Sequence, residues 1–128
     1  MARLIKSFCV SFLVLFAGVA TAAASDMDRL YRLIDAAEDG EPVVIPAGRY
    51  DITDLKLRED AHLKGDGDVI LYSSRPTEKG LLNPLRGVSL IVENLTFEGA
   101  VSPDLNGAGI RHDGDDLTII DCKFLSNE

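Results

Sequence analysis

The clearest pattern in the chain is an eight-residue stretch of alternating apolar and polar positions that occurs twice. Leu90–Phe97 reads Leu-Ile-Val-Glu-Asn-Leu-Thr-Phe, and Leu117–Phe124, 27 residues later, reads Leu-Thr-Ile-Ile-Asp-Cys-Lys-Phe. A weaker third copy begins another 27 residues upstream, at Leu63. Alternation of this kind is typical of β-strands that bury one face. A repeat at a fixed spacing of this size predicts a solenoid, in which each turn of the chain is covered by its neighbours.

The alternation shifts by one residue in the middle of each copy, at Gly67, Asn94 and Asp121. Gly, Asn and Asp are the residues that most readily adopt a left-handed backbone conformation. The chain is therefore expected to turn a sharp corner there, between two short strands. Stacked turns would then align equivalent side chains in two inward columns, made of Leu63, Leu90 and Leu117 and of Ile70, Phe97 and Phe124.

Together with two further segments, these repeats resemble the right-handed parallel β-helix proteins of the pectate-lyase-like superfamily. The segments are Val43–Tyr50, which holds a Pro-x-Gly-x-Tyr turn, and Ala61–Gly67, which ends in a Lys-Gly-x-Gly corner. The resemblance implies an all-β solenoid: a right-handed parallel β-helix with an N-terminal capping α-helix, open or truncated at its C-terminal end. Because the superfamily includes lyases, hydrolases, epimerases and non-enzymatic adhesins, it implies no single activity.

Two other folds fit parts of the pattern. A leucine-rich repeat also admits a period of 27 residues. Its asparagine would fall one residue before Asn94, however, and His112 would stand where the repeat needs a leucine. A small β-sandwich is the remaining alternative.

The sequence divides into three parts. Residues 1–24 are expected to form a signal peptide, because Arg3 and Lys6 precede an uncharged apolar core that ends in small residues. A retained membrane anchor is the alternative, which the short apolar run disfavours. Residues 25–40 are expected to form the capping helix and residues 41–128 the incomplete β-helix coils. The protein is thus predicted to be exported, either to the periplasm or out of the cell.

The predicted helix covers residues 25–39. Apolar residues recur at helical spacing on one face: Leu30, Leu33, Ile34 and Ala37. Ser25 or Asp26 can cap its start, and Gly40 followed by Pro42 should end it. Its expected role is to cover the open strand edge of the first coil.

Charge and cysteine content narrow the function. The formal net charge of the whole chain is −8, and loss of the two basic residues of the signal peptide would make it about −10. Such an acidic chain is not expected to bind nucleic acid, nor a membrane once the signal peptide is cleaved. Cys122 would be the one cysteine left, which excludes an internal disulfide; its place in the repeat predicts a buried thiol rather than a nucleophile.

One cluster could carry acid–base chemistry: Arg111, His112 and Asp113, followed by Asp115 and Asp116. A histidine beside an arginine and carboxylates could transfer protons or hold a cation. The competing interpretation is a solvated polar turn between two strands, since the repeat predicts a turn at this position.

A calcium site is the second candidate, with Asp66, Asp68 and Asp115 as ligands. Neither acidic segment has the spacing of a known calcium loop, so the turn is the preferred interpretation and no cofactor is evident. Many pectate lyases bind calcium through acids on later coils. The resemblance therefore implies calcium only for a longer parent protein.

The chain stops in mid-coil, without the closing cap that a solenoid needs. It is therefore expected to be a fragment or truncated product, or to cover its open end by self-association. The predicted function is a non-catalytic exported protein that binds a polysaccharide or cell-surface glycan, or that serves as a scaffold. The alternative is the N-terminal part of a polysaccharide-active lyase, hydrolase or epimerase whose active site lies on later coils.

Overall fold

The computed structural model describes residue 18 and residues 23–128, which contain one helix and nine strands. In order these are α1 (Asp26–Ala36), β1 (Val43–Asp51), β2 (Leu55–Leu57), β3 (Ala61–Tyr72), β4 (Gly80–Pro84), β5 (Leu90–Glu93), β6 (Thr96–Glu98), β7 (Ala108–Ile110), β8 (Leu117–Ile120) and β9 (Lys123–Leu125). The predicted signal peptide lies almost wholly outside the described residues. Within them, no helix has the length and apolar content that crossing a membrane requires.

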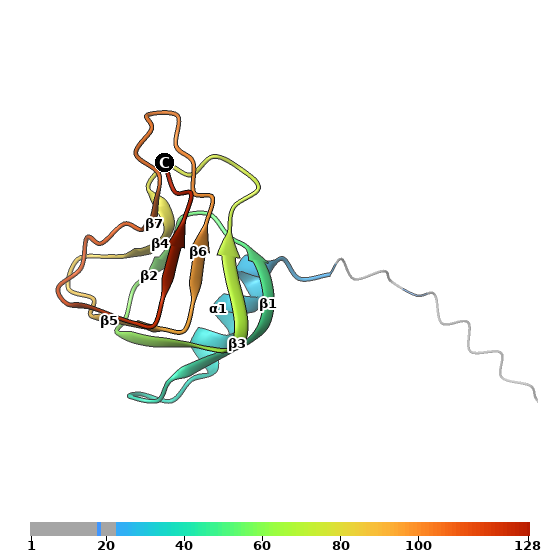
Figure 1. Ribbon diagram of the computed structural model, residues 1–128. Coiled ribbons are helices and arrows are strands. Elements are labelled where there is room, and N and C mark those ends of the chain that lie inside the picture. The colour runs from blue at the N-terminus through green and yellow to red at the C-terminus, as the bar shows by residue number, and fades with distance from the viewer. Residues whose placement is uncertain (1–17, 19–22) are drawn as a thin grey trace, which may run out of the picture.

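All strand pairs are parallel, and they form two sheets (Figure 1). In the six-stranded sheet the long strand β3 is central and pairs with β1 along most of its length. Its first half also pairs with β5, which pairs with β8, and its second half with β6, which pairs with β9. The smaller sheet has the order β2-β4-β7. The chain thus passes repeatedly from one sheet to the other and back, so that each parallel neighbour is reached by a long connection.

The prediction of an all-β solenoid, a right-handed parallel β-helix open at its C-terminal end, is wrong. The described residues form one helix and two separate parallel sheets, a mixed α/β arrangement with no closed solenoid. The physical reason lies in the connections between the sheets, which are turns rich in Gly and charged residues and form no third sheet to close each coil. These connections are residues 58–60, 85–89 and 111–116.

The predicted columns are only partly correct. Leu90 is in register with Leu117, and Phe97 with Phe124, as the repeat predicts. In the preceding strand, however, Leu90 is opposite Ala61 rather than Leu63, and Phe97 is opposite Leu71 rather than Ile70. The cause is the wide bend in β3 around residues 65–68, which holds three more residues than the corner at Asn94 and so shifts the two halves of the strand in opposite directions.

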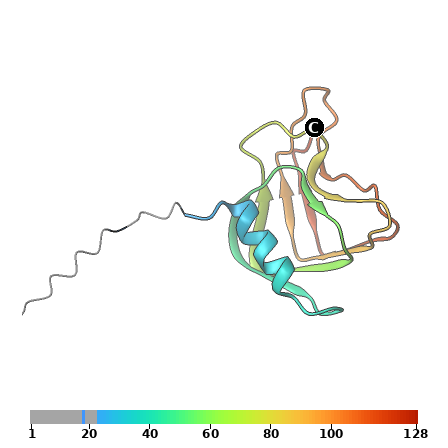
Figure 2. The ribbon, with the colours of Figure 1, turned by 180° about the vertical axis from the view of Figure 1, so that it is seen from behind.

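The predicted helix is confirmed, and it is shorter than expected. The hydroxyl of Ser25 accepts a hydrogen bond from the backbone N–H of Asp28 at 3.1 Å and caps the start. The helix ends at Ala36 because Ala37 is already extended. It lies across β1 (Figure 2), and Asp26 accepts a hydrogen bond from the backbone N–H of Asp51 at 2.8 Å. The helix therefore covers the first strand through both its apolar face and its first turn.

The core lies between the two sheets and α1. Its buried side chains are mostly Leu, Ile and Val from β1 to β6, with Phe97 among the largest. The last two strands are different, because large apolar side chains there are about half exposed: Ile119, Ile120, Phe124 and Leu125. Self-association through this apolar face stays a prediction.

Candidate functional site

The cluster predicted from sequence lies in the connection between β7 and β8, where the backbone is paired with the end of β4 and the turn after it. The N–H groups of Arg111, Asp113 and Asp115 donate to the carbonyl oxygens of Leu82, Pro84 and Val88, at 2.8, 3.1 and 2.9 Å. The segment is thus fixed by main-chain hydrogen bonds. The structure therefore places the cluster in a polar turn between two strands, as the competing interpretation predicted.

Asp113 is the centre of a hydrogen-bonded group. Its carboxylate accepts from the amide of Asn83 at 2.9 Å and lies 3.4 Å from both Lys79 Nζ and Arg111 Nε. The Asn83 amide, followed by the cations of Lys79 and Arg111, lowers the pKa of Asp113. Asn83 is itself buried and also donates to the carbonyl oxygen of Arg111, at 2.8 Å. Because three donors already stabilise its charged form, Asp113 is poorly suited to be a general base.

His112 does not join this group. Its Nε2 lies 3.3 Å from the backbone carbonyl oxygen of Asp115, and its Nδ1 is buried without a hydrogen-bond partner. The structure therefore brings Arg111 to Asp113, whereas His112 lies against the backbone of Asp115. Sequence proximity alone had grouped the three.

The calcium candidates are not assembled into a site. Asp66 and Asp68 are exposed in the bend of β3, whereas Asp115 is exposed in the connection before β8. Among the residues that the structure describes, no three His, Cys, Asp or Glu side chains are grouped so as to hold a metal ion. Calcium binding by a longer parent protein stays a prediction.

Cys122 lies between β8 and β9 and packs partly buried against the core. Its thiol donates to the carbonyl oxygen of Ile120 at 3.3 Å. Burial raises the pKa of the Cys122 thiol, which disfavours the thiolate that a nucleophile requires. This agrees with a packing role.

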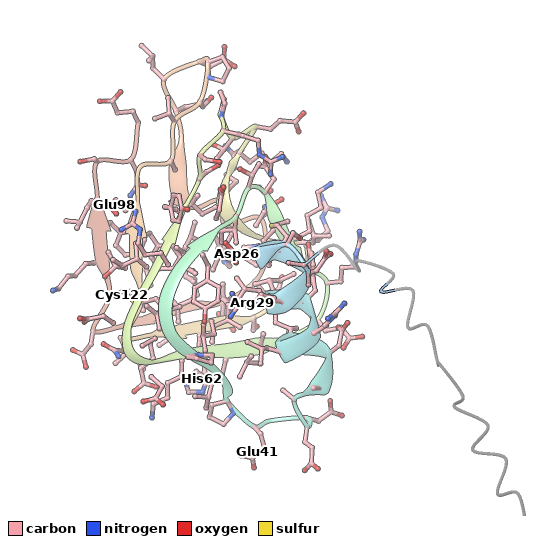
Figure 3. All side chains as sticks on the ribbon, turned by 90° about the vertical axis from the view of Figure 1, so that its right-hand side faces the viewer. Asp26, Arg29, Glu41, His62, Glu98 and Cys122 are labelled. Atoms are coloured by element: carbon pink, nitrogen blue, oxygen red, sulfur yellow. The ribbon has the colours of Figure 1, made fainter. Side chains whose placement is uncertain are left out.

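A different site lies at the C-terminal end of α1. The sequence analysis did not identify it. A cleft of about 710 Å³ separates the α1–β1 loop from the first residues of β3 and β5. The lining of this cleft, called the acidic cleft below, includes the partly or fully buried apolar side chains of Ile34, Val43, Ala61 and Ile91, which we call its floor. Figure 3 shows that Glu41 and His62, which both line it, lie at the same end of the molecule.

The rim of the acidic cleft is strongly negative. Six carboxylates line it: Asp35, Glu38, Asp39, Glu41, Glu59 and Asp60. Of the lining residues, only His62 can carry a positive charge, and its Nε2 already lies 3.0 Å from Glu93 Oε2. The C-terminal end of α1 opens into the cleft, and no basic residue occupies its last turn. The partial negative charge of a helix C-terminus therefore adds to that of the carboxylates.

This arrangement is suited to binding cations. The carboxylates are spread around the rim, and the lining includes no Lys, Arg, Cys or Tyr that could act with them. One sequence signal could have revealed the cleft. Acidic residues are concentrated in two turns, at residues 35–41 and 59–60, but only the parallel pairing of β1 with β3 places these turns side by side.

Comparison with known proteins adds no assignment: no family model, curated protein or solved structure matches this chain. The resemblance to the pectate-lyase-like superfamily therefore stays a prediction from sequence, and the function rests on the geometry of the described residues.

Proposed function

We propose that this protein is an exported, non-catalytic binding protein that holds positively charged ligands in the acidic cleft. The single observation that carries the proposal is the combination, in one cleft of about 710 Å³, of six carboxylates with an apolar floor. Clefts of this volume are typical of ligand sites. A surface with one sign of charge attracts ligands of the other sign and speeds their association.

The state of the predicted catalytic cluster supports a binding role. Asp113 is engaged by Asn83, Lys79 and Arg111, and His112 Nε2 lies against the backbone carbonyl oxygen of Asp115. These side chains therefore hold the connection between β7 and β8 against β4 and the residue before it.

The charge of the cleft also restricts any glycan ligand. A polyuronate chain would be repelled by the rim, so a glycan bound there would be neutral or would carry amino groups. No aromatic side chain lines the cleft to stack on a sugar ring. The glycan role expected from the sequence is therefore less well supported than cation binding.

The test is a set of calorimetric titrations of the protein without residues 1–24, at low and at physiological salt. Spermine and oligolysine should bind, more weakly as salt rises, because exposed charges are screened over about 10 Å at 0.1 M. Polygalacturonate should show neither binding nor turnover. A rise in absorbance from unsaturated products, with or without calcium, would contradict the non-catalytic role, and absence of any cation binding would contradict the cleft.

Export is tested separately. The full-length chain, expressed with its first 24 residues, should be recovered outside the cytoplasm with Ser25 as its new N-terminus. Retention of an intact N-terminus in a membrane fraction would favour the anchor instead.

A further inference from the structure

We propose that the ligand of the acidic cleft is a basic peptide segment of another protein, with two or more Lys or Arg side chains beside an apolar residue. This inference rests on the proposed function and specifies its ligand. Four properties of the cleft support it: the spread of the carboxylates, the apolar floor, the lack of aromatic lining residues and the elongated path of the cleft across the strands. Together they favour a basic peptide over other cations.

The distribution of the carboxylates disfavours a single metal ion. Calcium needs several oxygen ligands that converge at 2.3–2.6 Å, and no such group is present in the described part of the chain. The acids instead come from the last turn of α1, the loop after it and the turn before β3. A ligand that meets all of them must carry several charges spaced along its length.

The floor of the cleft disfavours a purely polar polycation. Ile34, Val43, Ala61 and Ile91 come from α1, β1, β3 and β5, and they are less exposed than the carboxylates of the rim. Lys and Arg side chains match both parts, because they lay an apolar stem on such a surface and keep the charged head at its edge. A peptide also supplies apolar side chains that could rest on the floor.

The absence of aromatic residues from the lining disfavours an amino sugar, which would lack a stacking platform. A second copy of this chain is a poor match for this cleft, because a chain with a net charge of −8 would meet the negative rim with charge of the same sign. A basic segment of another protein is the macromolecular ligand that remains.

The position of the backbone supports an elongated ligand. The cleft crosses the first residues of β1, β3 and β5 in turn, because these strands lie side by side in the sheet. The α1–β1 loop projects beyond the strands at this end of the molecule (Figures 1 and 2). Residues of this loop line the cleft together with the turn that holds Glu59 and Asp60.

The experiment compares one peptide with small cations on three variants of the protein. The peptide has the sequence Lys-Leu-Arg-Lys-Leu-Arg with both ends blocked, and spermine carries the same number of charges. The rim variant is Glu38→Gln, Asp39→Asn and Glu41→Gln. The matched control variant is Asp66→Asn, Asp68→Asn and Asp104→Asn, which removes the same charge from exposed positions outside the cleft. The floor variant is Ile91→Asn.

We expect the peptide to bind the unaltered protein at least tenfold more tightly than spermine. The rim variant should bind the peptide about tenfold more weakly, the size expected for three exposed charge pairs, and the control variant should change binding less than twofold. The floor variant should weaken peptide binding and leave spermine binding unchanged. Thermal melts of all variants identify any that fail to fold.

The outcomes separate this inference from the proposed function. Equal affinity for spermine and peptide, or a floor variant that changes neither, would overturn the peptide while the cation-binding cleft stands. Tighter binding of a chitosan oligosaccharide than of the peptide would likewise replace the peptide by an amino sugar. Equal weakening by the rim and control variants would overturn both proposals, because binding would then follow net charge alone.

Discussion

The side-chain amide of Asn94 donates hydrogen bonds to two carbonyl oxygens of the preceding strand, those of Gly65 at 3.0 Å and Gly67 at 3.1 Å. Asn94 also has a positive φ of 51°, so that one residue both turns the corner between β5 and β6 and ties it to β3. Gly65 has to be a glycine here, because a Cβ atom would overlap the carbonyl oxygen of Asn94. The same chemistry recurs at Asn127, whose amide group bonds to the backbone of Phe97 and Ala100.

Exchanging Asn and Asp at two equivalent corners, those at Asn94 and Asp121, should have opposite effects on stability. Asp121 occupies the same place one repeat later, with a φ of 49°, and its carboxylate cannot donate to a carbonyl oxygen. Asn94→Asp should lower the free energy of unfolding by about 1–2 kcal/mol, because it removes two donors and leaves their acceptors unpaired. Asp121→Asn should raise it by about 0.5–1 kcal/mol. Urea unfolding at pH 7 measures both, and equal destabilisation by the two would refute the equivalence of the positions.

The two stacked phenylalanines predict unequal contributions to stability. The rings of Phe97 and Phe124 are nearly parallel with centroids 4.9 Å apart, but Phe97 is fully buried whereas Phe124 is 45% exposed. Phe97→Ala should cost about 3–5 kcal/mol because it leaves a cavity. Phe124→Ala should cost about 1 kcal/mol, since solvent already reaches that ring. Similar losses in urea unfolding would mean that the last strands are covered in solution.

Asp54 predicts a dependence of stability on pH. It has a positive φ of 48°, and its carboxylate accepts hydrogen bonds from the backbone N–H groups of Glu78, Lys79 and Gly80, at 2.9, 2.8 and 3.2 Å. Burial alone would raise the pKa of Asp54, but these three donors outweigh it and the pKa lies below its ordinary value. The stabilisation is therefore present above the unfolded-state pKa, about 3.9, and is lost as pH falls through the folded-state value.

The variant Asp54→Asn isolates this contribution. It should lower the free energy of unfolding at pH 7 by about 1 kcal/mol, since an amide oxygen is a weaker acceptor than a carboxylate. Between pH 5 and pH 2 it should lose less stability than the unaltered protein. Parallel pH profiles for the two proteins in urea titrations would count against the three hydrogen bonds.

Replacing Asp113 should lower the stability of the protein without changing its ligand binding. Asp113→Ala removes one of the two acceptors of the buried Asn83 amide and the partner of Lys79. It should lower the melting temperature slightly, because the buried Asn83 amide loses one of its acceptors. Peptide binding at the acidic cleft should be unchanged. His112→Ala provides the comparison, and a loss of ligand binding in either variant would restore this cluster as a functional site.

The sequence by itself determined the local features of this protein. The alternation of apolar residues predicted the strands around Leu90–Phe97 and Leu117–Phe124, and their repetition predicted the parallel register of Leu90 with Leu117. The capping pattern at Ser25 predicted the helix. These features are encoded over a few neighbouring residues, where side-chain period and backbone preference act directly.

Only the tertiary structure decided what depends on distant segments. The wide bend in β3 moved Leu63 out of the predicted column, because a register is set by hydrogen bonds to the neighbouring strand and not by a constant spacing in sequence. The same pairing brings the turn at Glu59 and Asp60 against the loop after α1 and so creates the acidic cleft. The residues of the predicted cluster at Arg111–Asp113 are neighbours in sequence, yet they have different partners: Arg111 lies beside Asp113, whereas His112 lies against the Asp115 carbonyl oxygen.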